Sequence, residues 1–275
     1  LARLKTEFGL DAPIHERYLK WLGSILTGDW ATPLVSKRPV LAEIGERIPN
    51  TFYLALTAFI GSLLISIPIG VISATRQYSK FDNVFTTIAF MGQSLPVFWM
   101  GLIVIIIFNV ALKQPDGRPF LPGGGMATIG ADFELGDRLR HLILPAAVLI
   151  FFNMGTHVRY MRSGMLDVMH QDFIRTARAK GLDELGVIAK HGLRNALLPL
   201  ITIIGLELPG LFNGALITET IFSWPGMGRL FFNAIDRSDY AVMMGVLMIS
   251  AALIVLSGLL TDVMYGLLNP RIRFE

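Results

Sequence analysis

The 275-residue sequence contains no cysteine. Disulfide bonds, thiolate metal sites and cysteine nucleophiles are therefore excluded together. Charged residues are also scarce, at 16% of the chain against 53% hydrophobic residues, and the formal net charge is only +3. This is too little polar surface to cover a water-soluble globule of this size, and a small positive charge is typical of basic loops beside a membrane. The composition predicts an all-α polytopic membrane protein and gives no reason to expect nucleic-acid binding.

Several motifs of known chemistry are missing as well. The glycine run at 123–125 follows no predicted strand and is trailed by no lysine, so it indicates a flexible turn rather than a phosphate loop. Gly181 and Gly186 have the spacing of phosphate-loop glycines, but Val187 and Ile188 stand where Lys-Ser/Thr is required. The sequence shows no HxxxH or HExxH pair, nucleophile elbow or carboxylate dyad. We therefore expect no catalytic residue, no cofactor and no local metal site in this chain.

Long stretches without charge predict the membrane spans. A helix needs about 20 apolar residues to cross the hydrocarbon core of a bilayer. Five segments qualify: 48–75, 83–112, 142–158, about 197–218, and 240–261. The second is expected to be kinked at Pro96. The third is short in apolar length but is expected to continue as a helix to residue 169.

Basic residues indicate which ends of these spans face the cytoplasm. Arg76 and Lys80, the seven basic residues between Arg159 and Arg194, and a basic C-terminal end at 271–273 all fall on one side. Short basic loops stay inside, so this side is predicted to be cytoplasmic. The Gly- and Pro-rich stretch 113–140 is then an extracytoplasmic loop, and residues 1–50, with mixed charges at helical spacing, are expected to form one or two amphipathic helices.

The longest polar interval between two spans runs from 159 to 199. Within it, residues 172–181 predict a short helix, because Asp172 can cap its start and Gly181 can take the left-handed conformation at its end. Phe173 and Ala177 would form a small apolar face, beside a cationic rim of Arg175, Arg178 and Lys180. On charge alone, a loop that merely fixes topology is the simpler explanation.

Three motifs carry a resemblance to a known family: RTARAKGL at 175–182, RNALLP at 194–199 and ETIFSWPGMGRL at 219–230. Together they resemble the binding-protein-dependent ABC permeases, and specifically the first permease subunit of the dipeptide, oligopeptide and nickel branch. Arg175 and Thr176 stand where the wider family shows Glu-Ala, and the interval to Pro199 is longer than usual. Both departures are similar to those of the peptide branch.

The resemblance implies a type I ABC importer fold, with a further N-terminal span upstream of this sequence. It assigns residues 1–50 to an extracytoplasmic segment and 51–275 to the permease domain, with 159–199 as the cytoplasmic coupling loop. The coupling helix that docks on an ATPase would comprise Asp172, Phe173, Arg175, Thr176, Ala177, Arg178, Lys180 and Gly181.

The function implied is ATP-driven import of di- and oligopeptides across a bacterial plasma membrane, by a chain that is not itself an enzyme. The implied partners are a second permease subunit, two cytoplasmic ATPases that bind ATP and Mg²⁺, and an extracytoplasmic solute-binding protein. Import of nickel or another small solute by the same fold is one alternative. A membrane channel or enzyme that uses Glu207 is another.

Two groups of residues are candidates for the translocation path. Glu207 is expected near the centre of the fourth span, with Asn213 almost two turns further on, and a carboxylate at that depth lines a pathway or makes a structural hydrogen bond. Glu219, Trp224, Pro225 and Gly226 belong to a segment that the resemblance makes a re-entrant gate. A plain hairpin loop is the alternative there.

Overall fold

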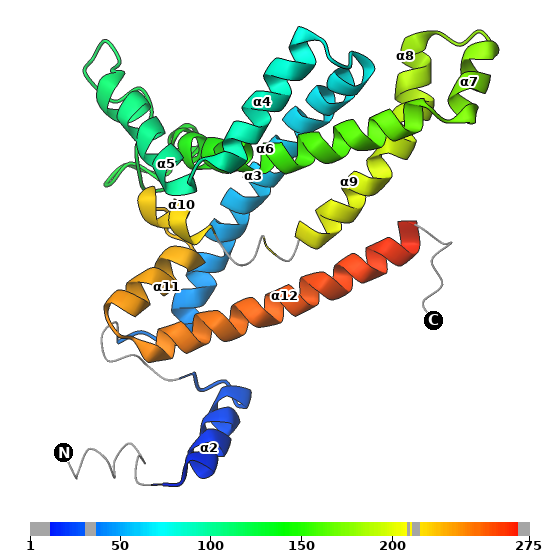
Figure 1. Ribbon diagram of the computed structural model, residues 1–275. Coiled ribbons are helices and arrows are strands. Elements are labelled where there is room, and N and C mark those ends of the chain that lie inside the picture. The colour runs from blue at the N-terminus through cyan, green and yellow to red at the C-terminus, as the bar shows by residue number, and fades with distance from the viewer. Residues whose placement is uncertain (1–11, 31–36, 208–209, 211–214, 269–275) are drawn as a thin grey trace.

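A computed structural model describes residues 12–30, 37–207, 210 and 215–268, with side chains up to residue 263 (Figure 1). Over these residues the regular structure is helical, apart from one isolated bridge between Lys113 and Pro119. Asn213, and the basic C-terminal end, lie outside the described residues. The helices, in chain order, are α2 (Ile14–Leu26), α3 (Val40–Thr75), α4 (Lys80–Ser94), α5 (Val97–Ile105), the π-helix η1 (Ile106–Ala111), α6 (Leu135–Met169), α7 (Asp172–Ala179), α8 (Glu184–Gly186), the π-helix η2 (Val187–Gly192), α9 (Leu193–Glu207), α10 (Leu216–Ile221), α11 (Met227–Asp236) and α12 (Tyr240–Leu268).

Within the described ranges, four helical segments are long and apolar enough to cross a membrane: α3, α6, the continuous run Glu184–Glu207, and α12. A fifth results if α4 and the helix that follows it count as one broken span. The prediction of five spans agrees with the second count. The first span begins earlier than predicted, at Val40, so α3 runs through residue 50.

The second span is broken rather than kinked. The two halves, 80–94 and 97–111, meet at 105°. Leu95 and Pro96 both have extended backbone, with ψ of 136° and 132°. Proline disfavours helical conformation in the residue before it and has no N–H to continue the hydrogen-bond ladder, and here these two effects give a sharp corner.

The core of the molecule is the packing of α6 against α3, α4 and α9 (Figure 1). Met161 and Met165 of α6 are fully buried between Ala74 of α3 and Leu200 of α9. Glycine allows the backbones to approach: a side chain at Gly92 of α4 would collide with the backbone oxygen of Phe151. Small residues at such contacts are what van der Waals association of helices in lipid requires.

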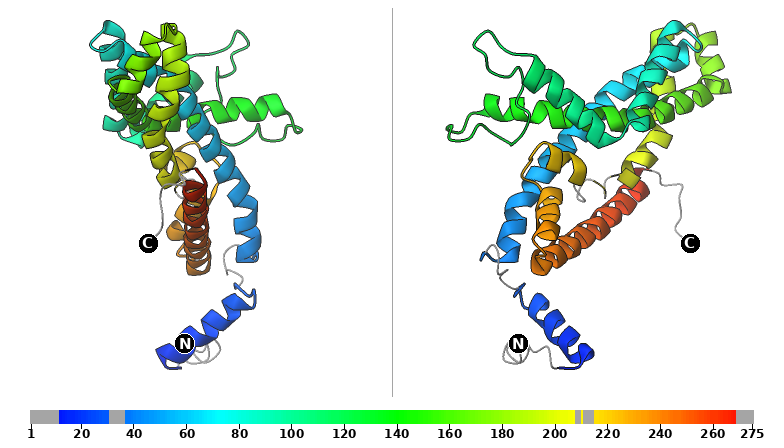
Figure 2. Two further views of the ribbon diagram at one scale, coloured as in Figure 1. Left: turned by 90° about the vertical axis from the view of Figure 1, so that its right-hand side faces the viewer. Right: turned by 60° about the vertical axis from the view of Figure 1, so that its left-hand side comes forward.

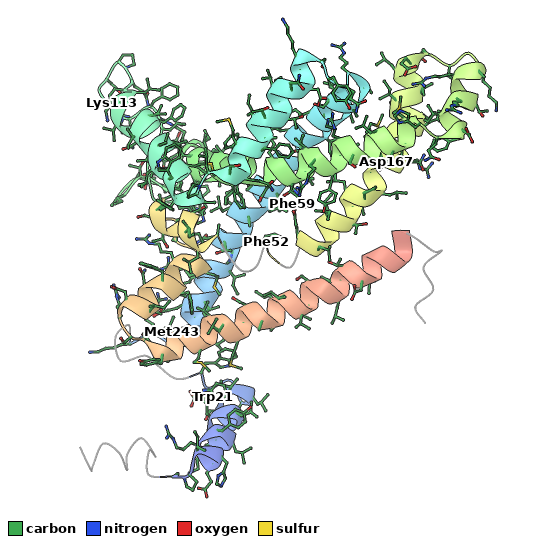
Figure 3. All side chains as sticks on the ribbon, in the orientation of Figure 1. Trp21, Phe52, Phe59, Lys113, Asp167 and Met243 are labelled. Atoms are coloured by element: carbon green, nitrogen blue, oxygen red, sulfur yellow. The ribbon has the colours of Figure 1, made fainter. Side chains whose placement is uncertain are left out.

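The remaining helices are attached more loosely. The α10–α11 hairpin lies against α3, and α12 is fastened at its start to α3 and α11 and near its end to α9, where Thr261 Oγ1 donates to the Gly205 carbonyl at 3.1 Å (Figure 2). Helix α2 has no buried side chain (Figure 3), which agrees with the predicted amphipathic helix in the N-terminal segment.

Candidate functional site

Helix α7 has the predicted position. Its C-terminal end is a Schellman arrangement, because the Gly181 N–H donates to the Arg178 carbonyl at 2.9 Å and the Leu182 N–H to that of Ala177 at 3.4 Å. Gly181 has φ of +80°, as predicted for a left-handed terminal residue. The predicted cap at the other end is wrong: Gln171 is the capping residue, and Asp172 lies in the first turn with an ion pair to Arg175 at 3.3 Å.

The buried face of α7 is not the predicted one. Ile174 and Ala177 are buried against Val187, with Val168 and Met169 around them. Phe173, which was expected to pair with Ala177, is 43% exposed. Spacing of i,i+3 and i,i+4 both place residues on one face, and only the position of the neighbouring helices decides which pair is covered.

Two residues of the predicted cationic rim have carboxylate partners: Arg175 pairs with Asp172 inside α7, and Arg178 pairs with Glu184 of α8. The Arg178 guanidinium donates to both carboxylate oxygens of Glu184, at 3.1 and 2.7 Å. These hydrogen bonds raise the pKa of Arg178 above its ordinary value. Arg178 thereby ties the end of α7 to α8. Arg175 and Lys180 remain on the exposed surface, beside Thr176 and Phe173.

Helix α7 is joined at both ends to membrane spans. Only His170 and Gln171 separate it from α6. Residues 180–183 separate it from α8, which continues through η2 into α9 without a break. The helical run that carries the fourth span begins at Glu184, before the predicted start of the span at about residue 197, and its described part ends at Glu207.

Glu207 is the last described residue of α9. Its Oε2 is 2.7 Å from Nε2 of His157 on α6, and Nδ1 of the same ring is 2.6 Å from the Ser62 hydroxyl on α3. His157 and Ser62 are fully buried, whereas the Glu207 side chain is 32% exposed. The side chains of Ser62, His157 and Glu207 thus form a hydrogen-bond network that connects α3, α6 and α9. The network ends in a carboxylate that reaches the protein surface.

His157, the central residue of this hydrogen-bond network, was not among the site residues predicted from the sequence. His157 directly follows an apolar run and has no histidine or acid at a metal-ligand spacing, so no motif marks it. The signal that could have found it is that a polar side chain in an apolar stretch needs a hydrogen-bond partner.

Glu219 forms a second buried polar cluster. Its carboxylate accepts from the Thr51 hydroxyl at 2.7 Å and from the Arg229 N–H at 3.1 Å. Thr51 Oγ1 in turn accepts from the Met227 N–H at 2.7 Å. Glu219 has no exposed surface, and a side chain at Gly226 would collide with its carboxylate.

Trp224 and Pro225 make further hydrogen bonds between the α10–α11 hairpin and α3. The Trp224 indole N–H donates to the Asn50 carbonyl at 2.9 Å, and the Asn50 side chain donates to the Pro225 carbonyl at 2.9 Å. Trp224 is fully buried. Residues 219, 224 and 225 therefore fasten the α10–α11 hairpin to α3, and Gly226 leaves the space that the Glu219 carboxylate needs. No pattern within either segment predicted Asn50 and Thr51 as their partners.

These features define a class: a polytopic helical membrane protein with a short surface helix anchored between two of its spans. The chain belongs to the family of binding-protein-dependent transport system inner membrane components, whose sequence profile matches residues 66–274. The family resemblance found in the sequence is confirmed.

Individual relatives are also permease proteins of transport systems. The oligopeptide transport system permease protein AppB of Bacillus subtilis (strain 168) is 47% identical over 98% of this chain and 83% of its own length. The dipeptide transport system permease protein DppB of Escherichia coli (strain K12) is 41% identical, covering 100% of this chain and 85% of the relative. The glutathione transport system permease protein GsiC of Salmonella choleraesuis (strain SC-B67) is 36% identical, with the same coverage of 100% and 85%.

A solved structure shares the fold. A chain of the inward-facing MetNI methionine ABC transporter superimposes with a TM-score of 0.63 at 15% identity, covering 82% of this chain and 95% of that one. The predicted all-α bundle of the type I ABC importer kind is confirmed.

Proposed function

We propose that this chain is the permease subunit of an ATP-driven peptide importer in a bacterial plasma membrane. It would form half of the translocation path, with a second, homologous permease subunit forming the other half. The permease relatives named above transport oligopeptides, dipeptides and glutathione according to their names, and glutathione is itself a small peptide. Peptide is therefore the cargo class that the relatives support.

The observation that carries this proposal is the attachment of α7. Its buried face is held by Val187 and its C-terminal end by the Arg178–Glu184 pair, while Phe173, Arg175 and Lys180 are exposed. A protein that binds the exposed face and moves α7 would move α6 and α9 with it, since both are joined to α7 within a few residues. We assign the exposed face to a cytoplasmic ATPase subunit.

In this proposal ATP and Mg²⁺ are bound by two such ATPase subunits, and an extracytoplasmic solute-binding protein delivers the peptide. The permease chain contributes movement and a path but no reacting group. Glu207 and Asn213 would line the path. The 219–226 segment would act as its outer gate, with the buried contacts to Asn50 and Thr51 making the gate move together with α3.

The absence of cysteine allows a direct test of the docking surface. Phe173→Cys introduces a single thiol on the exposed face of α7, and it should cross-link to a cysteine placed in the docking cleft of the partner ATPase. Tyr78→Cys is the matched control, because Tyr78 is 78% exposed on the turn between α3 and α4, which is predicted to face the same compartment. Equal cross-linking at both positions, or none at 173, would contradict the assignment.

Stimulation of ATPase activity by peptide and binding protein, but not by nickel, would separate the peptide importer from its nickel alternative.

Glu207→Gln tests the path. The substitution keeps the size of the side chain and its hydrogen-bonding capacity toward His157 but removes the negative charge. If the carboxylate faces the path, we expect severalfold changes in transport that differ among peptides of different charge. Ser62→Ala is the control for a structural role, because it alters the buried end of the same network. Unchanged uptake of all peptides by Glu207→Gln would return Glu207 to a structural hydrogen bond.

A further inference from the structure

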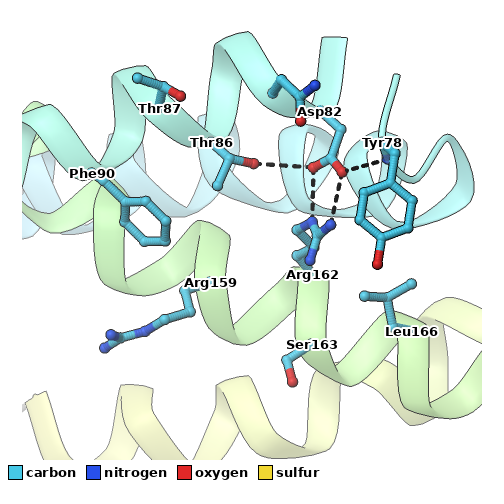
Figure 4. Close-up of a pocket in the computed structure, with 10 residues that line it drawn as sticks. Tyr78, Asp82, Thr86, Thr87, Phe90, Arg159, Arg162, Ser163 and Leu166 are labelled. Atoms are coloured by element: carbon cyan, nitrogen blue, oxygen red, sulfur yellow. Dashed lines mark hydrogen bonds and ion pairs between the residues drawn. The ribbon is translucent and has the colours of Figure 1, made fainter. Parts of the chain in front are cut away.

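A cavity of about 600 Å³ lies between α4 and α6, beside the turn that joins α3 to α4 (Figure 4). It includes neither the exposed face of α7 nor the hydrogen-bonded residues Ser62, His157 and Glu207. The Asp82–Arg162 pair lies at one end of it, and Arg159 and Phe90 lie at the other (Figure 4). Its polar lining is what distinguishes it from an ordinary gap between membrane helices.

The charge at the first end is fully compensated. Arg162 donates through Nε and Nη2 to the two carboxylate oxygens of Asp82, at 2.8 and 2.7 Å. The same carboxylate accepts from the Tyr78 N–H at 2.9 Å and the Thr86 hydroxyl at 3.1 Å. Asp82 is only 3% exposed, so the pair holds α4 and α6 together and presents no free negative charge to the cavity.

The second end carries a cation without a counterion. Arg159 is exposed, and its described contact is with the ring of Tyr160, 5.6 Å from the centroid. Among the described residues no carboxylate pairs with it. Thr87 and Ser163 line other parts of the cavity, away from the Arg159 guanidinium (Figure 4). This end of the cavity therefore offers one uncompensated positive charge, which suits a singly charged anion with several acceptor oxygens.

The position of the cavity along the helices identifies the source of such an anion. Arg159 is the first charged residue after the apolar run 142–158, and Arg76 and Lys80 follow the apolar run of α3. The cavity is thus level with the boundary between hydrocarbon and headgroups on the side predicted to be cytoplasmic, where anionic lipids concentrate and basic pockets between helices bind their headgroups. Phe90 and Leu166 give the same cavity an apolar wall.

We propose that this cavity is a binding site for the headgroup of an anionic phospholipid of the cytoplasmic leaflet. The phosphate would contact the Arg159 guanidinium, with the glycerol and upper acyl chain against Phe90. The Asp82–Arg162 pair sets the spacing of α4 and α6 that keeps the cavity open. The lipid would bridge two helices of the core that move when the transporter changes state.

The test measures lipid retention by native mass spectrometry of the purified membrane complex containing the full chain, titrated with phosphatidylglycerol or phosphatidylcholine. We expect one retained phosphatidylglycerol and no retained phosphatidylcholine. Arg159→Gln should weaken that binding about tenfold or more, the range of a hydrogen bond to a charged group. Arg76→Gln is the matched control, because it removes the same charge near the same membrane surface from an exposed residue that does not line the cavity, and binding should stay within about twofold.

A second variant tests the cavity without changing charge. Ser163→Trp would fill part of the cavity with a bulky side chain and should also abolish retention. Equal losses with Arg159→Gln and Arg76→Gln would overturn the site in favour of diffuse surface attraction. Undiminished retention in Arg159→Gln would overturn it as well. Displacement of the lipid by millimolar inorganic phosphate would assign the site to a free anion, and protection of Arg159 by a partner subunit would assign the cavity to a protein interface.

Discussion

At the scale of single residues, buried polar groups determine how the hairpin is attached to α3. Burying a carboxylate is costly unless its oxygens receive hydrogen bonds, and Glu219 receives them from Thr51 and from the backbone of Arg229. The turn at Pro225 and Gly226 brings those donors into position. Gly226 has extended backbone, with φ of −103° and ψ of −175°, so the need for glycine there is a matter of space and not of conformation.

We therefore predict that Gly226→Ala lowers the free energy of unfolding by about 1–3 kcal/mol, because the added methyl group collides with the Glu219 carboxylate. Thermal unfolding of the purified chain in detergent, followed by tryptophan fluorescence, measures the change. The matched control is Gly45→Ala on the exposed face of α3, where an added methyl group meets nothing within 4 Å. It should be neutral or stabilise by up to about 1 kcal/mol. Equal effects at both positions would show that the contact with Glu219 does not matter.

At the scale of elements, α7 shows what local pattern predicts well and what it does not. Its start, end and length follow from helix-forming residues and a terminal glycine, which act within a few residues of chain. Its orientation depends on α6 and η2, which cover Ile174 and leave Phe173 outside. The broken second span is similar: Pro96 predicted a change of direction, but the corner of 105° is set by the packing of α4 and α5 against α6.

At Gly181 we predict a graded loss of coupling. Its φ of +80° is unfavourable for residues with a side chain, at a cost of about 1–2 kcal/mol, and asparagine tolerates it best. Proline cannot adopt it and also loses the N–H that bonds to the Arg178 carbonyl. Peptide uptake and peptide-stimulated ATPase activity should fall in the order asparagine, alanine, proline, while the amount of chain in the membrane is unchanged. Full uptake by Gly181→Pro would contradict a coupling role for α7.

At the scale of the whole molecule, the distribution of charge determines how the bundle is placed in the membrane. The turn between α3 and α4 and the region around α7 lie toward one end of the core, whereas the 112–134 loop and the start of α6 lie toward the other (Figure 1). Basic residues are concentrated at the first end, and the apolar side chains exposed around α3 and α12 face lipid or a second subunit.

We predict that this topology is visible by thiol labelling, which the cysteine-free sequence permits without background. A membrane-impermeant maleimide should label Asp116→Cys in intact cells, because that side chain lies in the predicted extracytoplasmic loop and is 49% exposed. Lys180→Cys should react only in inverted vesicles. Labelling of Lys180→Cys from outside the cell would place α7 in the wrong compartment for an ATPase and would overturn the proposed function.

The sequence by itself determined the class of protein, the number and approximate position of the spans, the existence of α7 and the family. All of these depend on composition, on apolar length or on residues within about ten positions of each other. The tertiary structure decided which residues meet: His157 with Glu207, Glu219 with Thr51, and Arg162 with Asp82. Each pair joins different helices, 50 or more positions apart in the chain, and a hydrogen bond at that separation leaves no periodic trace. For that reason the sequence predicted Glu207 as a candidate for the path but not its partner, which is His157 of α6.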